Sequence, residues 1–275
     1  MDGALPLVGA LIGLAIAPFL RRLADQVPGR HPLFGSSGGR PFVASELIPV
    51  ASWFADDPAG TVSLVGSPDD RDEAAETLQR RWRAPVIDLT TAALCGAMAH
   101  HVGWQPALAA FLVFSASMVV VTVIDIDHFR IPDRITFPTL GLCVTLLAVA
   151  AAIDGLGSAL VIGLVGAAAY FVFLFLFFIV WPRGMGFGDV KLAAVLGLHL
   201  GWAGSTTTID STVVERGGEF GIQLVLYGAL AGSLLGSVIG IGALLLRGRN
   251  AAFPFGPALC AGALAIILAS DQLLG

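Results

Sequence analysis

The chain contains apolar runs too long for most helices of soluble proteins. Seven of them have the length that a helix needs to cross a hydrocarbon layer, about 17–25 residues. They lie at residues 4–20, 86–103, 107–124, 134–153, 157–181, 220–246 and 252–274. A shorter run, Val190–Trp202, is predicted as a short span or a re-entrant helix. The sequence therefore predicts an all-α fold, a polytopic membrane helical bundle of about eight transmembrane helices.

The composition supports lipid as the solvent of this chain. Hydrophobic residues make up 56% of it and charged residues only 13%, against roughly 25% charged residues in a soluble domain. That is too little charge to cover a water-facing surface, so the lipid bilayer is the expected partner. No basic stripe and no alternation of aromatic and basic residues is present, so we expect no nucleic-acid partner.

The charges between the runs predict the orientation. Arg21 and Arg22 follow the first run and no basic residue precedes it, the reverse of a secretory signal, so we interpret it as a spanning helix that ends in the cytoplasm. With the short run counted as a span, 14 of the 15 lysines and arginines fall on the cytoplasmic side, and Arg216 is the exception. If the short run did not span, Arg247 and Arg249 would fall on the outer side, so the charge count favours eight spans.

One polar segment divides the chain. Residues 21–85 are rich in glycine, proline, serine and acidic residues, and we expect a partly ordered cytoplasmic loop with an amphipathic helix near Ala74–Trp82. The predicted domains are therefore 1–85, a first helix plus this loop, and 86–275, the membrane domain.

Acidic residues at the ends of apolar runs are the chemically informative feature. Asp125 directly follows Val119–Ile124, where the helix should still lie in the apolar layer. Asp189 follows a glycine-rich stretch and precedes the short apolar run. Because an ionised carboxylate is costly in hydrocarbon, such residues usually face a cavity or serve a function.

Simpler interpretations stand beside this one. Asp127 and Asp133 can be ordinary charges at a helix end, and Asp133 can also cap the next helix. Asp189 can be the N-cap of its own helix. His128 and Lys191 are typical of polar anchors at the membrane interface.

Two of the carboxylates suit acid–base chemistry. Asp125 and Asp189 fall at the same membrane face in the predicted topology, and two close carboxylates do not both ionise easily, so they share a proton. One can then activate a water while the other polarises a carbonyl group. Asp127 lies two positions after Asp125, a rotation of about 200° around the helix, and should face away.

These residues carry a resemblance to a known family. Asp125–Pro132, D-I-D-H-F-R-I-P, resembles the first aspartate motif of type IV prepilin peptidases, and Gly186–Asp189, G-F-G-D, resembles their G-x-G-D motif. Glu46–Phe54 is similar to the family's N-terminal segment, and Phe253–Pro257, F-P-F-G-P, to its last helix.

The resemblance implies an aspartic endopeptidase with Asp125 and Asp189 as catalytic residues. It would remove the leader of prepilins or pseudopilins, for a type IV pilus or type II secretion, at the cytoplasmic face of the inner (plasma) membrane. No cofactor is implied for proteolysis. Family members often also methylate the new terminus with S-adenosylmethionine, and this stays open here.

The chain departs from the family in its cysteines. Many members carry two C-x-x-C pairs in the first loop, thought to bind zinc, whereas residues 21–85 contain no cysteine. Cys95, Cys143 and Cys260 each lie alone in an apolar run and are interpreted as small buried residues. We therefore expect no metal site.

A transporter or channel is the alternative function, because intramembrane acids also mark ion pathways. The clustering of the acids at one face argues against it. The sequence leaves open which pilins are cleaved and the oligomeric state.

Overall fold

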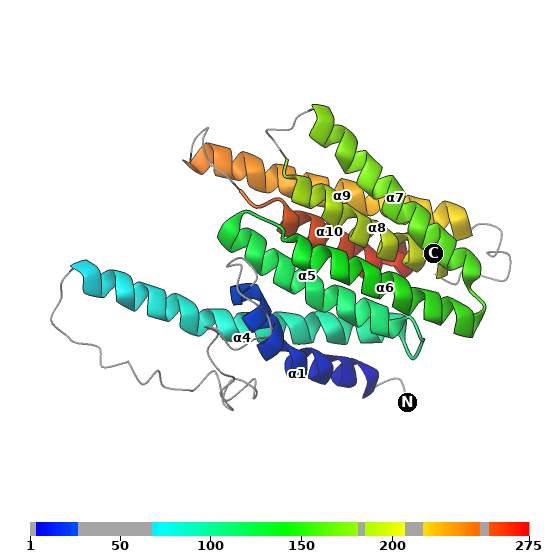
Figure 1. Cartoon of the computed structure of the whole chain (residues 1–275), viewed down its shortest axis with the longest axis horizontal. Coiled ribbons are helices and arrows are strands. Elements are labelled where there is room, and N and C mark those ends of the chain that lie inside the picture. Colours follow the sequence, from blue (N-terminus) through cyan, green and yellow to red (C-terminus); the bar gives the residue numbers. More distant parts are fainter. Residues whose placement is uncertain (1–3, 27–67, 181–184, 207–216, 248–252, 275) are drawn as a thin grey trace.

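The structure is a computed structural model that describes residues 4–26, 68–180, 185–206, 217–247 and 253–274. Every regular element in these ranges is a helix (Figure 1). The helices are α1 (Leu5–Gln26), α4 (Pro68–Val102), α5 (Leu108–His128), α6 (Asp133–Asp154), α7 (Gly157–Val180), α8 (Phe187–Thr206), α9 (Gly217–Arg247), α10 (Gly256–Leu268) and the short α11 (Ser270–Leu274). The predicted all-α class is confirmed.

End residues aside, six of the seven long apolar runs and the short run Val190–Trp202 each lie in one helix, whereas the last run, 252–274, is divided between α10 and α11. Of the other helices, α4 and α8 are longer than expected. The run 86–103 is the second half of α4, which begins at Pro68 and continues through Pro85. The helix expected near Ala74–Trp82 is thus the first half of the same element. The predicted domain boundary at residue 85 falls inside α4, and the division into two domains stays a prediction.

Five described helices are long and apolar enough to cross a membrane: α1, α5, α6, α7 and α9. Two shorter apolar segments add to these: the whole of α10 and the second half of α4. The run Val190–Trp202 belongs to α8, a helix of 20 residues of which 14 are buried. Its neighbours shield α8, so α8 can carry polar residues at membrane depth. A multi-pass membrane bundle is therefore supported, and the number of about eight spans stays approximate.

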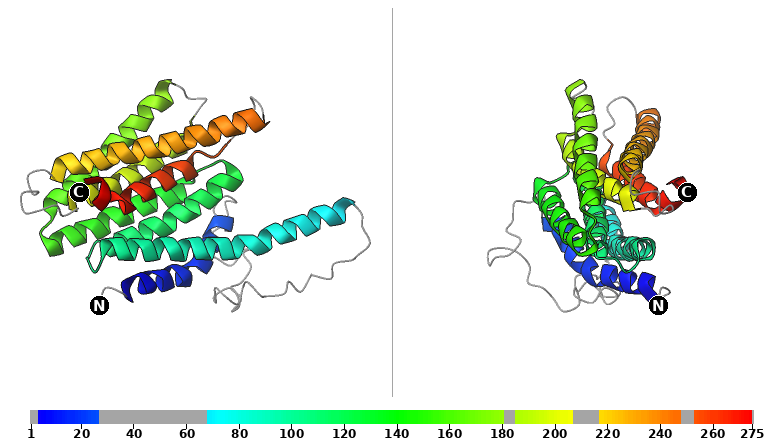
Figure 2. Two further views of the ribbon diagram at one scale, coloured as in Figure 1. Left: turned by 180° about the vertical axis from the view of Figure 1, so that it is seen from behind. Right: turned by 90° about the vertical axis from the view of Figure 1, so that its right-hand side faces the viewer.

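Successive helices from α4 to α10 run in alternating directions (Figures 1 and 2). The end of α5 and the starts of α6, α8 and α10 consequently lie at one end of the bundle. This is the end that carries the expected acidic residues.

Glycine-lined contacts hold α8 at the centre. Gly197 and Gly201 on α8 face Gly163 and Gly166 on α7, so that backbone approaches backbone. Small residues at such spacing allow the close packing that drives association of membrane helices. A β-carbon added at Gly201 would lie 2.8 Å from the carbonyl oxygen of Ile162.

We expect Gly201→Ala to lower the apparent melting temperature in detergent. Overpacking typically costs about 1–3 kcal/mol, whereas an alanine in a helix gains only about 1 kcal/mol over glycine. Gly141→Ala on α6 is the matched control, because no atom lies within 4 Å of the added carbon. The control should melt at the wild-type temperature or above; equal melting of both variants would contradict the packing argument.

The turn between α5 and α6 brings helix ends together at this end of the bundle. α5 ends at His128, and the turn that follows leads through Ile131 and Pro132 into α6. A residue before proline is disfavoured in helical conformation, which explains the break. Ile131 is 7% exposed and packs against Gly188 at the start of α8 and Gly256 at the start of α10. One buried side chain thus joins three helix ends.

Candidate active site

Two buried carboxylates face one cavity at this end of the bundle. Asp125, in the last turn of α5, is 5% exposed, and Asp189, in the first turn of α8, is 7% exposed. Both line a cavity of about 100 Å³. The two residues singled out from the sequence are therefore brought together by packing of α5 against α8 and α10.

Asp125 is held by the start of α10. The backbone N–H of Gly256, the first residue of that helix, donates a hydrogen bond of 2.9 Å to its Oδ2. The first N–H groups of a helix have no partner within the helix, and the helix dipole favours a carboxylate there. A β-carbon at position 256 would lie 2.7 Å from the same Oδ2. Only glycine leaves room for this contact.

Asp189 is held by its own turn. Its Oδ2 accepts a hydrogen bond of 3.2 Å from the N–H of Gly186, and its own N–H donates to the carbonyl of Gly186 at 3.1 Å. This is the back-reaching half of a capping box, with Asp189 as the third residue of α8 and not as the N-cap. Gly188 allows the close approach of Ile131, since a β-carbon there would lie 2.9 Å from the Ile131 Cβ.

Apolar side chains form the rest of the wall. Besides the two aspartates, the cavity is lined by Phe129, Met185, Gly186, Phe253, Pro254 and Phe255. The rings of Phe253 and Phe255 fit against Gly240 and Gly236 of α9, where an added β-carbon would collide with them. These wall residues are absent from the sequence-based site, although Phe129 and Gly186 lie in the two aspartate motifs and Phe253–Phe255 in the F-P-F-G-P stretch.

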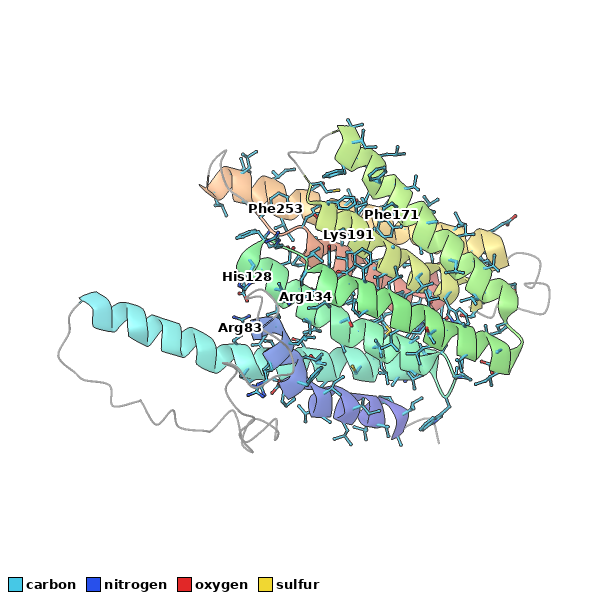
Figure 3. The ribbon with its side chains drawn as sticks, in the orientation of Figure 1. Arg83, His128, Arg134, Phe171, Lys191 and Phe253 are labelled. Carbon is cyan, nitrogen blue, oxygen red and sulfur yellow. The ribbon has the colours of Figure 1, made fainter. Side chains whose placement is uncertain are left out.

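The neighbouring acids make different contacts. Asp127 pairs with Arg83 of α4, and Asp133 pairs with Lys191 of α8 at 2.6 Å. Neither lines the cavity. Figure 3 shows Arg83 and Lys191 at the same end of the bundle as His128, Arg134 and Phe253. The expectation that Asp127 faces away from Asp125 agrees with this geometry.

Lys191 was expected to anchor at the interface, and the structure gives it a definite contact. Besides Asp133, its Nζ lies 4.9 Å from the ring centre of Phe187 and 5.5 Å from that of Phe137. The ammonium group thus ties the start of α8 to the start of α6. The ion pair is partly exposed and contributes little by itself.

The three cysteines are buried and free, as interpreted from the sequence. Within the described ranges, no group of three or more His, Cys, Asp or Glu residues could hold a metal ion. Most of the first loop lies outside those ranges, and the expectation of no metal site stays a prediction for the whole chain.

Comparisons with known proteins agree with the geometry. Residues 112–241, which include Asp125 and Asp189, match the type IV leader peptidase family. A prepilin leader peptidase/N-methyltransferase of Pseudomonas aeruginosa is 30% identical over 197 residues, which cover 70% of this chain and 60% of that protein. The protein of the same name from Bacillus subtilis is 32% identical over 190 residues, covering 69% of this chain and 67% of that protein.

A third relative with that name, from Burkholderia pseudomallei, is 35% identical over 198 residues, covering 67% of this chain and 54% of that protein. The chain thus spans about 60% of the length of the first relatives. No solved structure matches.

Proposed function

This chain belongs to the type IV leader peptidase family, and we propose that it is an aspartic endopeptidase that cleaves the leader of prepilins or pseudopilins. The observation that carries the proposal is the pair of buried carboxylates, Asp125 and Asp189, on one cavity at the end of a membrane bundle. The names of the relatives supply the substrate class.

In the proposed reaction Asp125 and Asp189 share one proton, because two close carboxylates in a buried site do not both ionise easily. The ionised carboxylate takes a proton from a water, whose oxygen attacks the carbonyl carbon of the scissile peptide bond. The protonated carboxyl donates a hydrogen bond to the carbonyl oxygen. When the C–N bond breaks, a proton passes to the leaving nitrogen, and the dyad is ready again.

The fixed hydrogen bonds support this role. Each aspartate has one oxygen, Oδ2, bound by a backbone N–H, from Gly256 for Asp125 and from Gly186 for Asp189. A carboxylate held at one oxygen by backbone keeps its orientation during proton transfer, and such preorganisation is what catalysis at a buried site requires.

We infer that the cavity faces the cytoplasm, at the inner membrane of a bacterial cell. Arg83, Arg134 and Lys191 lie at the cavity end of the bundle in Figure 3, and an excess of basic residues marks the cytoplasmic side. A substrate with an apolar helix in the membrane and its leader in the cytoplasm would meet the cavity at the junction of the two.

Labelling of a cysteine placed at Ser63 tests the orientation. We expect an impermeant thiol reagent added to intact cells to leave Ser63→Cys unlabelled, and to label it after the membrane is permeabilised. The native cysteines are buried and give the background. Labelling in intact cells would place the loop, and the cavity with it, on the outer side.

A transporter is the weaker candidate on the structure as well. The buried carboxylates of the described residues are Asp88, Asp125 and Asp189. The Oδ1 of Asp88 lies 3.1 Å from the Nε of Arg21, so Asp88 forms an ion pair that links α4 to α1. The other two lie on the one cavity, and the relatives are named as peptidases.

Methylation is not part of the proposal. The relatives are also named N-methyltransferases, and S-adenosylmethionine would supply the methyl group. The cavity beside the aspartates has about 100 Å³ and a second, at the other end of α8, about 170 Å³. Sites for small molecules begin near about 300 Å³, so neither of these two cavities, as the described residues form them, is large enough for the whole cofactor.

The direct test is cleavage of a synthetic prepilin by the purified chain in detergent, followed by mass spectrometry of the products. We expect a single cut that separates the leader from the apolar segment. An intact substrate, with a relative of known activity cutting it in the same detergent, would overturn the proposal.

A further inference from the structure

Phe129 has a backbone conformation that a phenylalanine rarely adopts. Three residues in the described ranges have positive φ: Gly103 at 72°, Gly155 at 71° and Phe129 at 51°. Each of the three follows the last residue of a helix, and its N–H donates to the carbonyl oxygen four residues earlier. The acceptors are Ala99, Ala151 and Asp125. Glycine is the usual residue here because it has no β-carbon to strain. Two of the three helix ends follow that rule, and the end beside the cavity does not.

Burial of the ring does not explain the exception. Phe129 is 52% exposed, so its ring adds little to the apolar core. A bulky residue with positive φ is a genuine outlier, and such strain collects at functional sites. The side chain must therefore supply something that glycine at this turn cannot.

Its place suggests what that is. Phe129 lines the cavity together with both aspartates, Met185 and Phe253. Its N–H donates to the carbonyl oxygen of Asp125 at 2.8 Å, so the backbone of Phe129 is tied to the last turn that carries the carboxylate. The left-handed turn thus places an exposed aromatic residue on the wall of the cavity that holds both aspartates.

We propose that Phe129 is a specificity-determining residue, whose ring contacts the apolar residues of the substrate that adjoin the scissile bond. The inference rests on the proposed peptidase function. An apolar stretch beside a peptide bond must leave lipid to reach the carboxylates, and Phe129 and Phe253 offer it apolar side chains in the lining of the cavity. On this proposal, the strained turn serves to bring the Phe129 side chain to the cavity.

Two substitutions separate this role from that of a helix cap. Phe129→Gly relieves the strain and removes the ring, whereas Phe129→Leu keeps both the strain and an apolar side chain. We expect Phe129→Gly to melt at the wild-type temperature or above, yet to raise the KM for a synthetic prepilin about tenfold, since loss of one apolar contact changes discrimination by about 10–200-fold. Phe129→Leu should stay within about threefold of wild type, since an aliphatic side chain keeps most of the apolar contact area.

A second readout addresses specificity. With serine in place of the apolar residue after the scissile bond, the wild-type enzyme should lose kcat/KM, and Phe129→Gly should lose much less, because the ring that distinguishes the two substrates is gone. Phe177→Ala is the matched control: Phe177 is 54% exposed on α7 and does not line the cavity, so its kinetics should equal those of wild type.

The outcomes are distinct from those that test the peptidase itself. If wild type cleaves, Asp125→Asn does not, and Phe129→Gly cleaves with unchanged KM and unchanged preference, only the role of Phe129 falls. If Phe129→Gly melts at a lower temperature than wild type, the strain argument is wrong and the inference falls with it. If wild type leaves every substrate intact, the peptidase proposal itself falls.

Discussion

Asp125→Asn and Asp189→Asn are each expected to abolish cleavage of a prepilin leader while leaving a folded, membrane-inserted protein. An asparagine keeps the shape of the side chain and can still accept the hydrogen bond from Gly256 or Gly186. It cannot take or give the shared proton. Acid–base residues contribute about 10²–10⁴-fold, and a pair that acts as one unit loses nearly all of its effect when either member is removed. The measurement is the initial rate of leader release in detergent.

The neighbouring acids provide the matched controls. Asp127→Asn and Asp133→Asn remove the same charge from the same segment, but their partners are Arg83 and Lys191 and they lie off the cavity. Each should keep substantial activity, because partly exposed ion pairs are worth about 0–1 kcal/mol. The double variant of Asp125 and Asp189 should be no worse than either single variant. Loss of cleavage in Asp127→Asn with near-normal cleavage in Asp125→Asn would contradict the assignment.

The position of the carboxylates followed from the sequence because it rests on local rules. An acid at the end of a long apolar run must avoid lipid, and a helix of about 3.6 residues per turn separates Asp125 from Asp127 by more than half a turn. The alternation of spans then places the end of α5 and the start of α8 at one end of the bundle (Figure 1). None of these steps needs knowledge of packing.

The length of α8 did not follow in the same way. Val190–Trp202 looks too short to span because Asp189 precedes it and the polar Lys191 and His199 lie within it. In the structure α8 is surrounded by other helices, and the fully buried His199 stacks on the ring of Phe114 at 4.0 Å. Shielding by neighbours, which hydropathy does not measure, lets such a helix carry polar groups.

The walls of the cavity depend on contacts between distant segments. Gly256 meets Asp125 only because α10 packs on α5, and Phe129 adopts its turn without any local signal of glycine or asparagine. The stretch F-P-F-G-P marked a resemblance but not a role. Its place in the cavity wall depends on Gly236 and Gly240 of α9, which leave space for the rings of Phe255 and Phe253.

Gly256→Ala is expected to reduce cleavage about 10²-fold, although the substitution adds a single methyl group. The new β-carbon would lie 2.7 Å from the Oδ2 of Asp125 and 3.1 Å from the Cδ1 of Ile131. Neither neighbour can retreat freely, because Ile131 also packs on Gly188 and Asp125 is 5% exposed. The carboxylate must therefore turn away from the N–H of residue 256 and lose the orientation that the reaction needs.

Gly157→Ala is the matched control for that substitution. Gly157 is likewise the first residue of a helix, α7, and no atom lies within 4 Å of its added carbon. Both variants make the same change at the same helical position, so any general effect of alanine on a helix start appears in both. A drop in kcat at an unchanged KM, confined to Gly256→Ala, would identify displacement of Asp125, since substrate contacts at the cavity wall are untouched. Equal activity of the two variants would mean that the hydrogen bond from α10 does not position the carboxylate, and that the α10 helix start serves packing alone.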